Sequence, residues 1–479
     1  MKPSRHLRIL TVFFLCLCLL SGITSRSAVT VYAASTDSVG NGSESYPVPP
    51  ETESGNCILM DADTGIILYE KNSEEKCYPA SVTKLMTALL VVENCNLNDT
   101  LTVSANAVSS VKYGDASAAL KKDEEFTVEQ ALNIMLIKSA NDMAYALGEH
   151  VGGSIANFAT MMNKRAAELG CTDTHFSNAS GLTDINHYTT AHDMALICRA
   201  VINSPAIMNA ISYTKSYSVP PTNKTADTRY YRLSHSMVTG KYLYEYCLGG
   251  KTGYTDAAGH TLATFAEKDG LRLICVVFNS TDEQRYIDTT ALFEYAFNNF
   301  HRMNIAQNED TFSFNQGLGL SAFGVSGKAL SGGADITLSV PDSDYVLVPD
   351  GVSFSDLTKE IVFNNSTPSE EGYDENSAGS PDTTFAEINY YYAGRLLGHT
   401  NLVFSEKLST DGTSDSASLT GLPYLINTEE SSVDMSALLR EGHFFSVNIW
   451  LCVIVLCIII LAVIILINVK KNRHNLRFS

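Results

Sequence analysis

The stretch Tyr78-Pro-Ala-Ser-Val-Thr-Lys-Leu-Met-Thr-Ala-Leu-Leu-Val-Val-Glu93 decides how the rest of this 479-residue chain is interpreted. It predicts a helix that begins after Pro79 and carries a broad apolar face of leucine, methionine and valine. Ser81 falls in the first turn, where backbone N–H groups are unpaired. Lys84 follows three residues later, so we expect its amine and the Ser81 hydroxyl on the same face.

This Ser-x-x-Lys pair has a chemical and a structural interpretation. A serine is a poor nucleophile until a neighbouring group takes its proton, and a desolvated amine one helical turn away can do so. The structural interpretation is a helix cap beside a solvated lysine, which explains the same spacing at Ser73/Lys76, Ser109/Lys112 and Ser212/Lys215. The apolar helix and two later motifs favour the chemical interpretation for Ser81/Lys84.

Both ends of the chain carry membrane-related signals. Residues 1–34 combine basic residues, an apolar run and a small-residue exit at Tyr32-Ala33-Ala34, which predicts a signal peptide. Ile449 to Ile467 is apolar and long enough to span a bilayer, although a buried core helix is the alternative. We expect a transmembrane helix over 448–469 and a cytoplasmic tail over 470–479, because basic residues follow the span. The body of this single-pass protein would then lie outside the cell membrane.

The body divides by composition into a mixed region and a β-rich region. Residues 35–54 are rich in Ser, Gly, Pro and Thr and predict a flexible linker. Residues 55–300 begin with strands, continue with helices and end with strands and a helix, which predicts an α+β domain with an antiparallel sheet. Residues 301–426 predict a small all-β domain resembling a sandwich, and 427–447 a juxtamembrane linker.

Caps and periodicity place the individual elements of the body. A capping box at Thr127 to Gln130 predicts the start of one helix, and Gly170 and Pro205 follow the ends of two others. We expect helices over 127–138, 139–151, 154–169, 190–202 and 282–300. We also expect two strands around an Asp-Thr-Gly turn in 57–69, a hairpin over 260–278, and a second hairpin over 385–404 that turns near Ala393-Gly394.

Charge and cysteine content exclude several classes of function. The net charge is −19, and without the basic residues of 1–34 and the tail the body has 25 basic against 52 acidic residues, a net charge of −27. Such a body has no general attraction for nucleic acid, and an anionic substrate would need a local cationic pocket. Seven of the eleven cysteines lie outside the two apolar ends. Their spacing matches no disulfide framework or metal site, and we interpret most as buried apolar residues.

Two further motifs complete a possible catalytic constellation. Ser139-x-Asn141 is weak alone, because the same spacing occurs at Ser104/Asn106 and Ser446/Asn448. Lys251-Thr-Gly253 occurs once, at the start of a predicted strand, where glycine permits close backbone approach. A turn, a cap or a strand end explains each motif singly. Their joint occurrence, in this order and at domain-scale spacing, favours a nucleophilic serine enzyme.

On these motifs the chain resembles the low-molecular-mass penicillin-binding proteins, which are serine-type D-Ala-D-Ala carboxypeptidases of the same superfamily as class A β-lactamases. The resemblance is strong over residues 55–300 and looser beyond them. It rests on the segments Pro79-Ala-Ser-Val-Thr-Lys-Leu-Met-Thr87, Ser139-Ala-Asn-Asp142, Phe176-Ser-Asn-Ala-Ser-Gly-Leu182, His187-Tyr-Thr-Thr-Ala-His-Asp-Met194 and Lys251-Thr-Gly-Tyr-Thr255. One departure is Ser234-His235-Ser236, where the family has Asn-x-Asn.

The resemblance implies a role for each residue of the site and no cofactor or metal. Peptidoglycan stem peptides would be the substrates, and β-lactam antibiotics would act as inhibitors. Lys84 would act uncharged, whereas Lys251 would stay charged in a wet part of the cleft. The resemblance implies that Ser81 is the nucleophile, Lys84 the general base and Ser139 a proton relay. Asn141 would bind the substrate amide, Lys251 and Thr252 would bind its carboxylate, Gly253 would permit close backbone approach, and the N–H groups of Ser81 and Tyr254 would form an oxyanion hole. Arg285 resembles an arginine near the carboxylate site, although a surface cap explains it equally well.

Three other functions remain open at this point. A class A β-lactamase needs a glutamate that drives deacylation, and no Glu-x-x-Leu-Asn segment lies between Asn141 and Lys251. A D,D-endopeptidase would keep the fold and cut cross-links. A catalytically inactive wall-binding scaffold would keep the fold alone, and release of D-alanine from a pentapeptide separates it from the enzymes.

Overall fold

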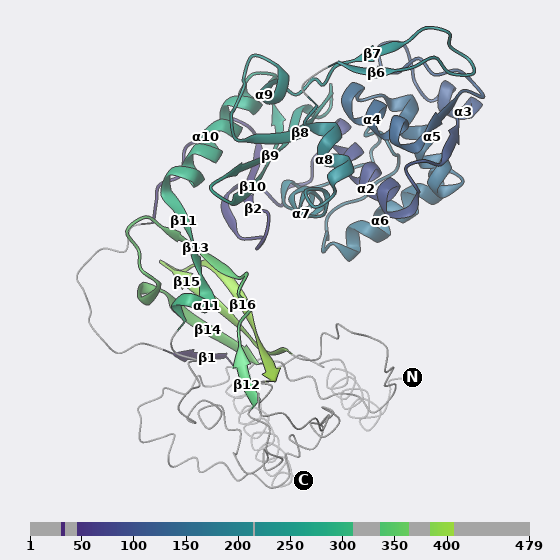
Figure 1. Ribbon diagram of the computed structural model, residues 1–479. Helices are drawn as coiled ribbons and strands as arrows, with labels where there is room; N and C mark the ends of the chain where they lie inside the picture. Colours follow the sequence, from purple (N-terminus) through teal and green to yellow (C-terminus); the bar gives the residue numbers. More distant parts are fainter. Residues whose placement is uncertain (1–29, 34–45, 214–215, 310–335, 364–383, 407–479) are drawn as a thin grey trace, which may run out of the picture. The chain divides into compact units, whose positions relative to one another are not determined.

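A computed structural model describes residues 30–33, 46–213, 216–309, 336–363 and 384–406 of the chain. Its centre is a five-stranded antiparallel sheet in the order β3-β2-β10-β9-β8 (Figure 1). The strands are β2 (Asn56–Asp61), β3 (Ile67–Lys71), β8 (Cys247–Thr255), β9 (Gly259–Lys268) and β10 (Leu271–Ser280). The α+β class is therefore confirmed, and β8 is an edge strand of the sheet.

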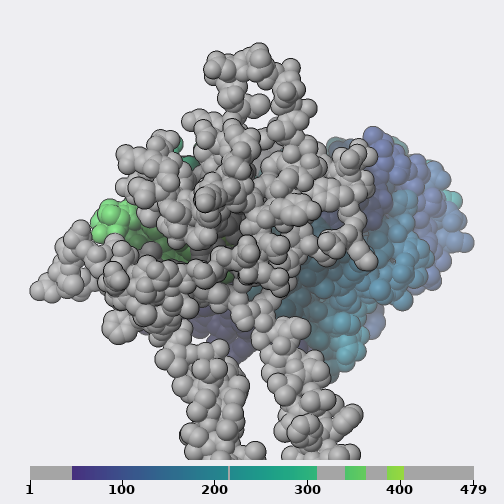
Figure 2. Space-filling view, turned by 90° about the horizontal axis from the view of Figure 1, so that it is seen from below, coloured from purple at the N-terminus to yellow at the C-terminus, as the bar shows by residue number. Residues whose placement is uncertain are grey.

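Helices cover both faces of this sheet, with α10 (Gln284–Asn299) on one face (Figure 1). Alternate strand residues face opposite layers: Ile58 and Ile274 pack with the larger helical layer, whereas Leu59 and Val277 pack toward α10. Figure 2 shows part of the outer surface of the larger layer, coloured blue. That layer contains α2 (Lys84–Asn94), α4 (Val128–Lys138), α5 (Asn141–Gly152), α6 (Ile155–Glu168), α7 (Ala191–Val201) and α8 (Pro205–Ile211).

The predicted caps are confirmed where they mark helix starts. Thr127 and Gln130 form the expected capping box, with bonds of 3.0 and 3.1 Å between each side chain and the other residue's N–H. Pro205 has a second role that we did not predict, because it occupies the first turn of α8. The sequence pattern also did not predict six short elements. These are β4 (Thr100–Thr102), α3 (Ala105–Ser109), β5 (Glu125–Thr127), β6 (Tyr217–Val219), β7 (Arg229–Tyr231) and α9 (Ser236–Thr239).

The predicted flexible linker over 35–54 is wrong for its second half. Residues 46–54 are described, and Ser54 is buried against α10. The Ser54 N–H donates to the Asp288 carboxylate at 2.8 Å, and the Tyr295 hydroxyl donates to the carbonyl of Pro47 at 3.0 Å. Proline and polar residues gave this segment a linker-like composition, but the buried Asp288 carboxylate and the Tyr295 hydroxyl bond backbone groups within it.

A second group of strands follows α10. β11 (Phe300–Asn304) pairs with β13 (Tyr345–Pro349), and β13 packs on β16, because the Gly398 backbone there lies against Val346. The β15–β16 hairpin turns at Ala393-Gly394, as predicted. The other elements are β1 (Thr30–Ala33), α11 (Ile305–Asn308), β12 (Ile336–Ser339), η3 (Phe354–Asp356), β14 (Thr358–Phe363), β15 (Thr384–Tyr392) and β16 (Arg395–Glu406), with the five-stranded order β1-β14-β15-β16-β12.

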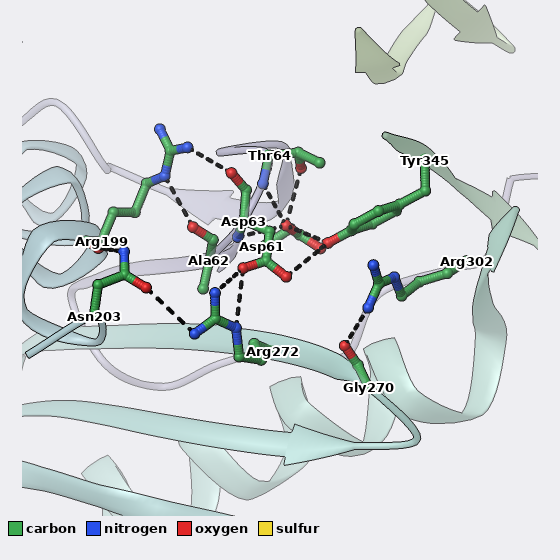
Figure 3. Close-up of polar contacts among 10 residues, drawn as sticks. All are labelled: Asp61, Ala62, Asp63, Thr64, Arg199, Asn203, Gly270, Arg272, Arg302 and Tyr345. Atoms are coloured by element: carbon green, nitrogen blue, oxygen red, sulfur yellow. Dashed lines mark hydrogen bonds and ion pairs between the residues drawn. The ribbon is translucent and has the colours of Figure 1, made fainter. Parts of the chain in front are cut away.

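Figure 3 shows the polar cluster where β13 meets the turn after β2. The Tyr345 hydroxyl donates to Asp61 at 2.8 Å, and the Arg302 guanidinium lies 3.7 Å from the centre of the Tyr345 ring. Arg272 binds the neighbouring Asp63 carboxylate. Burial raises the pKa of Asp61, while hydrogen bonds from Thr64 and Tyr345 oppose that rise. The predicted Asp-Thr-Gly turn is therefore a contact point for the later strands.

The predicted membrane segments fall mostly outside the described residues. Of the predicted signal peptide, only Thr30–Ala33 is described, as an edge strand paired with β14. The predicted transmembrane helix over 448–469 lies outside the described residues. Among the helices that are described, none alone is long and apolar enough to cross a membrane; α7 and α8 reach that composition only as a pair bent by 112°.

Candidate active site

Ser81 lies in a 3-10 turn, η1 (Ala80–Thr83), that leads directly into α2. The turn is tighter than the expected helical start, because the Lys84 N–H bonds the Ser81 carbonyl. Ala80 has a φ of 47°, a left-handed conformation that is uncommon for alanine. A side chain at Gly181 would overlap the Ala80 carbonyl, so glycine is required where this turn meets the neighbouring loop.

Lys84 is fully buried, and its amine has three polar partners. Nζ lies 2.9 Å from Ser81 Oγ, 2.6 Å from Asn141 Oδ1 and 2.7 Å from the Ser180 carbonyl oxygen. Burial lowers the pKa of Lys84 well below its usual value, and the nearby Lys251 lowers it further. The predicted pairing of Lys84 with Ser81 is present in the structure, and Asn141 belongs to the same contact network.

The junction between α4 and α5 places Ser139 and Asn141 in the site. Ser139 adopts a left-handed conformation with a φ of 59°, which ends α4 and redirects the chain into α5. The Asn141 N–H donates to the Ala116 carbonyl at 2.8 Å. Asp142, whose role we did not predict, accepts from the Ser117 hydroxyl at 2.6 Å. The loop between α3 and β5 is therefore tied to the start of α5.

Lys251 projects from β8 toward Ser139. Its Nζ donates to Ser139 Oγ at 3.0 Å and to the Thr252 carbonyl at 2.7 Å. We expected a wet environment, but Lys251 is only 1% exposed. Burial, and then the charge of Arg285, lower the pKa of Lys251 to about 7. The side chain is buried against Ser139 at the end of α4, so the predicted wet environment is wrong for the free protein.

The three residues after Lys251 make different contacts: with Ser234, with the turn that carries Ser81, and with solvent. A side chain at Gly253 would overlap Thr261 Oγ1 and approach the Ser81 nitrogen, so glycine lets β8 lie against the turn that carries Ser81. The Thr252 hydroxyl lies 2.9 Å from Ser234 Oγ. Tyr254 is 55% exposed, and its ring lies 4.5 Å from that of His260. Its side chain points to solvent, which leaves its backbone as the part that faces the edge of the sheet.

Arg285 is buried beneath the β8–β9 pair, so the surface-cap interpretation is wrong. Its guanidinium donates to the carbonyl oxygens of Gly253 at 3.3 Å and Thr261 at 3.2 Å. It also pairs with Asp282 at 2.5 Å, while its Nε atom is buried and has no partner among the residues that the structure describes. Arg285 thus supports β8 from behind and contributes a positive charge close to Lys251.

A loop whose residues carried the resemblance also forms a wall of the site. Asn178 Oδ1 accepts from the N–H groups of Ser180 at 3.1 Å and Gly181 at 2.8 Å, which aims the Ser180 carbonyl at Lys84. His187 Nε2 lies 2.8 Å from Thr83 Oγ1, and the Ser177 N–H donates to the other ring nitrogen. Burial lowers the pKa of His187 to about 4. Asn-x-Ser-Gly is typical of a tight side-chain-stabilised turn, which is the signal that could have predicted this role.

The described residues contain no cluster of three or more His, Cys, Asp or Glu side chains that could hold a metal ion. The seven cysteines outside the two apolar ends are all free, and Cys57, Cys171, Cys198 and Cys275 are buried, as we expected for most of them.

Comparisons with known proteins agree on the same region. The model of the D-alanyl-D-alanine carboxypeptidase family matches residues 43–282. The chain is 31% identical over 329 residues to D-alanyl-D-alanine carboxypeptidase DacF of Bacillus subtilis, covering 67% of this chain and 79% of that relative. It is 30% identical over 303 residues to DacC of Escherichia coli, covering 61% and 73%. Penicillin binding protein 5 from Haemophilus influenzae shares the fold, with a TM-score of 0.57 at 23% identity over 74% of this chain and 98% of that one.

The matched region contains Ser81, Ser139 and Lys251, and Arg285 lies three residues beyond it. It covers half of the chain, and the DacF match spans most of that relative's length. The chain therefore belongs to the D-alanyl-D-alanine carboxypeptidase family of serine peptidases.

Proposed function

We propose that this protein removes the terminal D-alanine from peptidoglycan pentapeptide stems through an acyl-enzyme on Ser81, and that β-lactams acylate the same serine. The family and the names of the relatives support this activity. The observation that carries the mechanism is the 2.9 Å approach of the buried Lys84 amine to Ser81 Oγ. A desolvated amine in contact with a hydroxyl is a competent general base.

The partners of Lys84 orient it as a base. A neutral amine has two N–H groups and one lone pair. Asn141 Oδ1 and the Ser180 carbonyl can only accept, so they take the two N–H groups. The lone pair then faces the Ser81 hydroxyl, whose proton it accepts as Oγ attacks the substrate carbonyl. Asn141 therefore orients the Lys84 amine, in addition to its implied contact with the substrate amide.

The second amine organises the other half of the reaction. Lys251 holds Ser139 Oγ at 3.0 Å, where Ser139 can pass a proton to the leaving D-alanine nitrogen. Lys251 and Thr252 are the proposed binding groups for the substrate carboxylate. A carboxylate beside Lys251 favours the charged amine, so substrate raises a pKa that is about 7 in the free protein. Binding of substrate thus restores the positive charge of Lys251, which in turn binds the substrate carboxylate.

The backbone of the edge strand supplies the proposed oxyanion hole. Gly253 brings β8 against the Ser81 nitrogen, so the Ser81 and Tyr254 N–H groups are proposed to stabilise the developing oxyanion. Arg285 fixes this part of β8 through the Gly253 carbonyl and adds positive potential for the carboxylate. Its donors bond protein carbonyls and Asp282, so we assign it a supporting role and not direct contact with substrate.

The structure argues against the β-lactamase alternative. Deacylation in class A enzymes needs a carboxylate that activates water. In the described part of the chain, Lys84 has two carbonyl partners and one hydroxyl partner, and no carboxylate. Asp142, which directly follows Asn141, is occupied by the Ser117 hydroxyl and by the backbone N–H groups of Ala118 and Leu120. The site favours a long-lived acyl-enzyme with β-lactams.

Release of D-alanine tests the proposed activity. The purified protein should release one D-alanine from a pentapeptide stem, and Ser81→Ala should release none, because no other serine in the described residues has this arrangement of base and partners. A labelled penicillin should modify Ser81 alone, as read by peptide mapping. Modification of Ser73, Ser109, Ser139 or Ser212 instead would contradict the assignment of the nucleophile. Cleavage of a cross-linked dimer without release from the pentapeptide would favour the endopeptidase.

Arginine substitutions separate the roles of the two buried lysines. Lys84→Arg should slow acylation by at least about a hundredfold, because a guanidinium does not give up its proton in proteins. Lys251→Arg keeps the charge and should mainly raise KM, by roughly ten- to a hundredfold through poorer hydrogen-bond geometry. Single-turnover acylation rates of the two variants make the comparison. If Lys84→Arg acylates as fast as the parent, Lys84 is not the base.

The two lysines also predict a bell-shaped pH dependence of kcat/KM. Activity needs neutral Lys84, so it should rise as pH increases through the lowered pKa of that residue. It needs charged Lys251, so it should fall as pH rises through about 7 in the free protein. Lys251→Arg should remove the alkaline limb, since arginine stays charged. A limb that persists unchanged in this variant would assign it to another group.

We infer further that the enzyme is held outside the cell by the predicted membrane helix over 448–469. The support is the length and apolarity of that segment and the basic residues after it. Truncation after Thr428 should give a soluble enzyme with unchanged turnover of small peptides, measured against the full-length protein in detergent. A truncated protein that folds but has lost this turnover would show that the C-terminal segment takes part in the site.

A further inference from the structure

The departure from the family's Asn-x-Asn pattern lies next to the proposed carboxylate pocket. Ser234 is exposed, and its Oγ lies 2.9 Å from Thr252 Oγ1 on the edge strand β8. Either hydroxyl can be the donor in this pair. Two hydroxyl groups in direct contact, one of them proposed to touch the substrate, form a hydrogen-bonded chain that begins at a residue with no assigned role.

A buried neighbour fixes the position of Ser234. His235 is fully buried, with Nε2 3.1 Å from Thr264 Oγ1 and its ring edge-on to Tyr286 at 5.8 Å. The ring lies so close to Gly250 that any side chain there would overlap it. His235 thus holds its own segment against β8, on the face of the strand that Gly250 and Thr252 share. Ser234, the preceding residue, is anchored within reach of Thr252.

His235 adds no positive charge to this pocket. Burial, and then the charges of Arg285 and Lys251, lower its pKa to about 3. The imidazole is therefore neutral whenever the enzyme is active. Attraction of an anion is left to the two cations, and the two hydroxyl groups are left to orient it.

We propose that Ser234 is a positioning residue that sets the direction of the Thr252 hydroxyl toward the substrate carboxylate. A hydroxyl carries one hydrogen. If Thr252 donates that hydrogen to the carboxylate, its oxygen is free to accept from Ser234. The hydrogen bonds then run in one direction, from Ser234 to Thr252 to the carboxylate, and each strengthens the next. The proposal rests on the assignment of Thr252 to carboxylate binding.

The test compares a peptide ending in D-Ala-D-Ala with the same peptide as its C-terminal amide, which lacks the carboxylate. Ser234→Ala should lower the acylation rate at limiting substrate by about two- to tenfold for the free acid, through loss of one hydrogen bond. It should leave the rate for the amide unchanged. Ser234→Thr should restore the ratio between the two substrates, because it restores the hydroxyl. Ser218→Ala, at an exposed serine of β6, is the matched control and should change neither rate.

A double-mutant cycle with Thr252→Val shows whether Ser234 acts through Thr252. In the Thr252→Val background, Ser234→Ala should have no further effect on the acid-to-amide ratio. An equal effect in both backgrounds, or an equal loss for acid and amide, would overturn the proposal. If Thr252→Val itself leaves the ratio unchanged, the carboxylate assignment fails. If Thr252→Val lowers the ratio and Ser234→Ala does not, the assignment stands and only the role of Ser234 is wrong.

Discussion

Burial of the Lys84 amine is the constraint on which the rest of the site depends. A charged amine without water or a counter-ion is costly, so the group is neutral when its partners are carbonyl and hydroxyl oxygens. Those partners come from three places far apart in the sequence: the turn before α2, the start of α5 and the loop at Ser180. The fold must bring all three together to surround the amine that we propose as the base. Much of the helical layer therefore serves to exclude water from one nitrogen atom.

The same principle gives different results for the two lysines. Lys251 is as buried as Lys84, yet its pKa falls only to about 7. Its partners are the Ser139 hydroxyl and the carbonyl of Thr252 on its own strand. Because this pKa is near neutral pH, a bound carboxylate is enough to shift Lys251 from its neutral to its charged form. A protein with a net charge of −19 can therefore bind an anion locally. Arg285 behind β8 contributes to that positive potential and lowers the pKa of Lys251.

The sequence predicted the contacts between the motif residues of the site better than their surroundings. Short motifs fix local geometry, so the Ser81/Lys84 contact and the capping box at Thr127 follow from spacing and cap chemistry. The burial of Lys251 could not be read from the sequence, because it depends on how β8 packs against the helical layer. The segment 46–54 was misassigned for a related reason. Its polar composition is that of a linker, and its order comes from Asp288, more than two hundred residues away.

That distant contact links the start of the body to the site. Arg285 and Asp288 lie three residues apart on α10, so they project from the same side of the helix. Asp288 binds the N–H of Ser54, and Arg285 binds the carbonyls of Gly253 and Thr261 beneath the edge strand. One helix face thus fixes the incoming chain and the strand that lies against Ser81. Since β8 is an edge strand, it lacks a second neighbouring strand to hold it in place. α10 supplies that support from behind, on the strand that we propose to bind substrate.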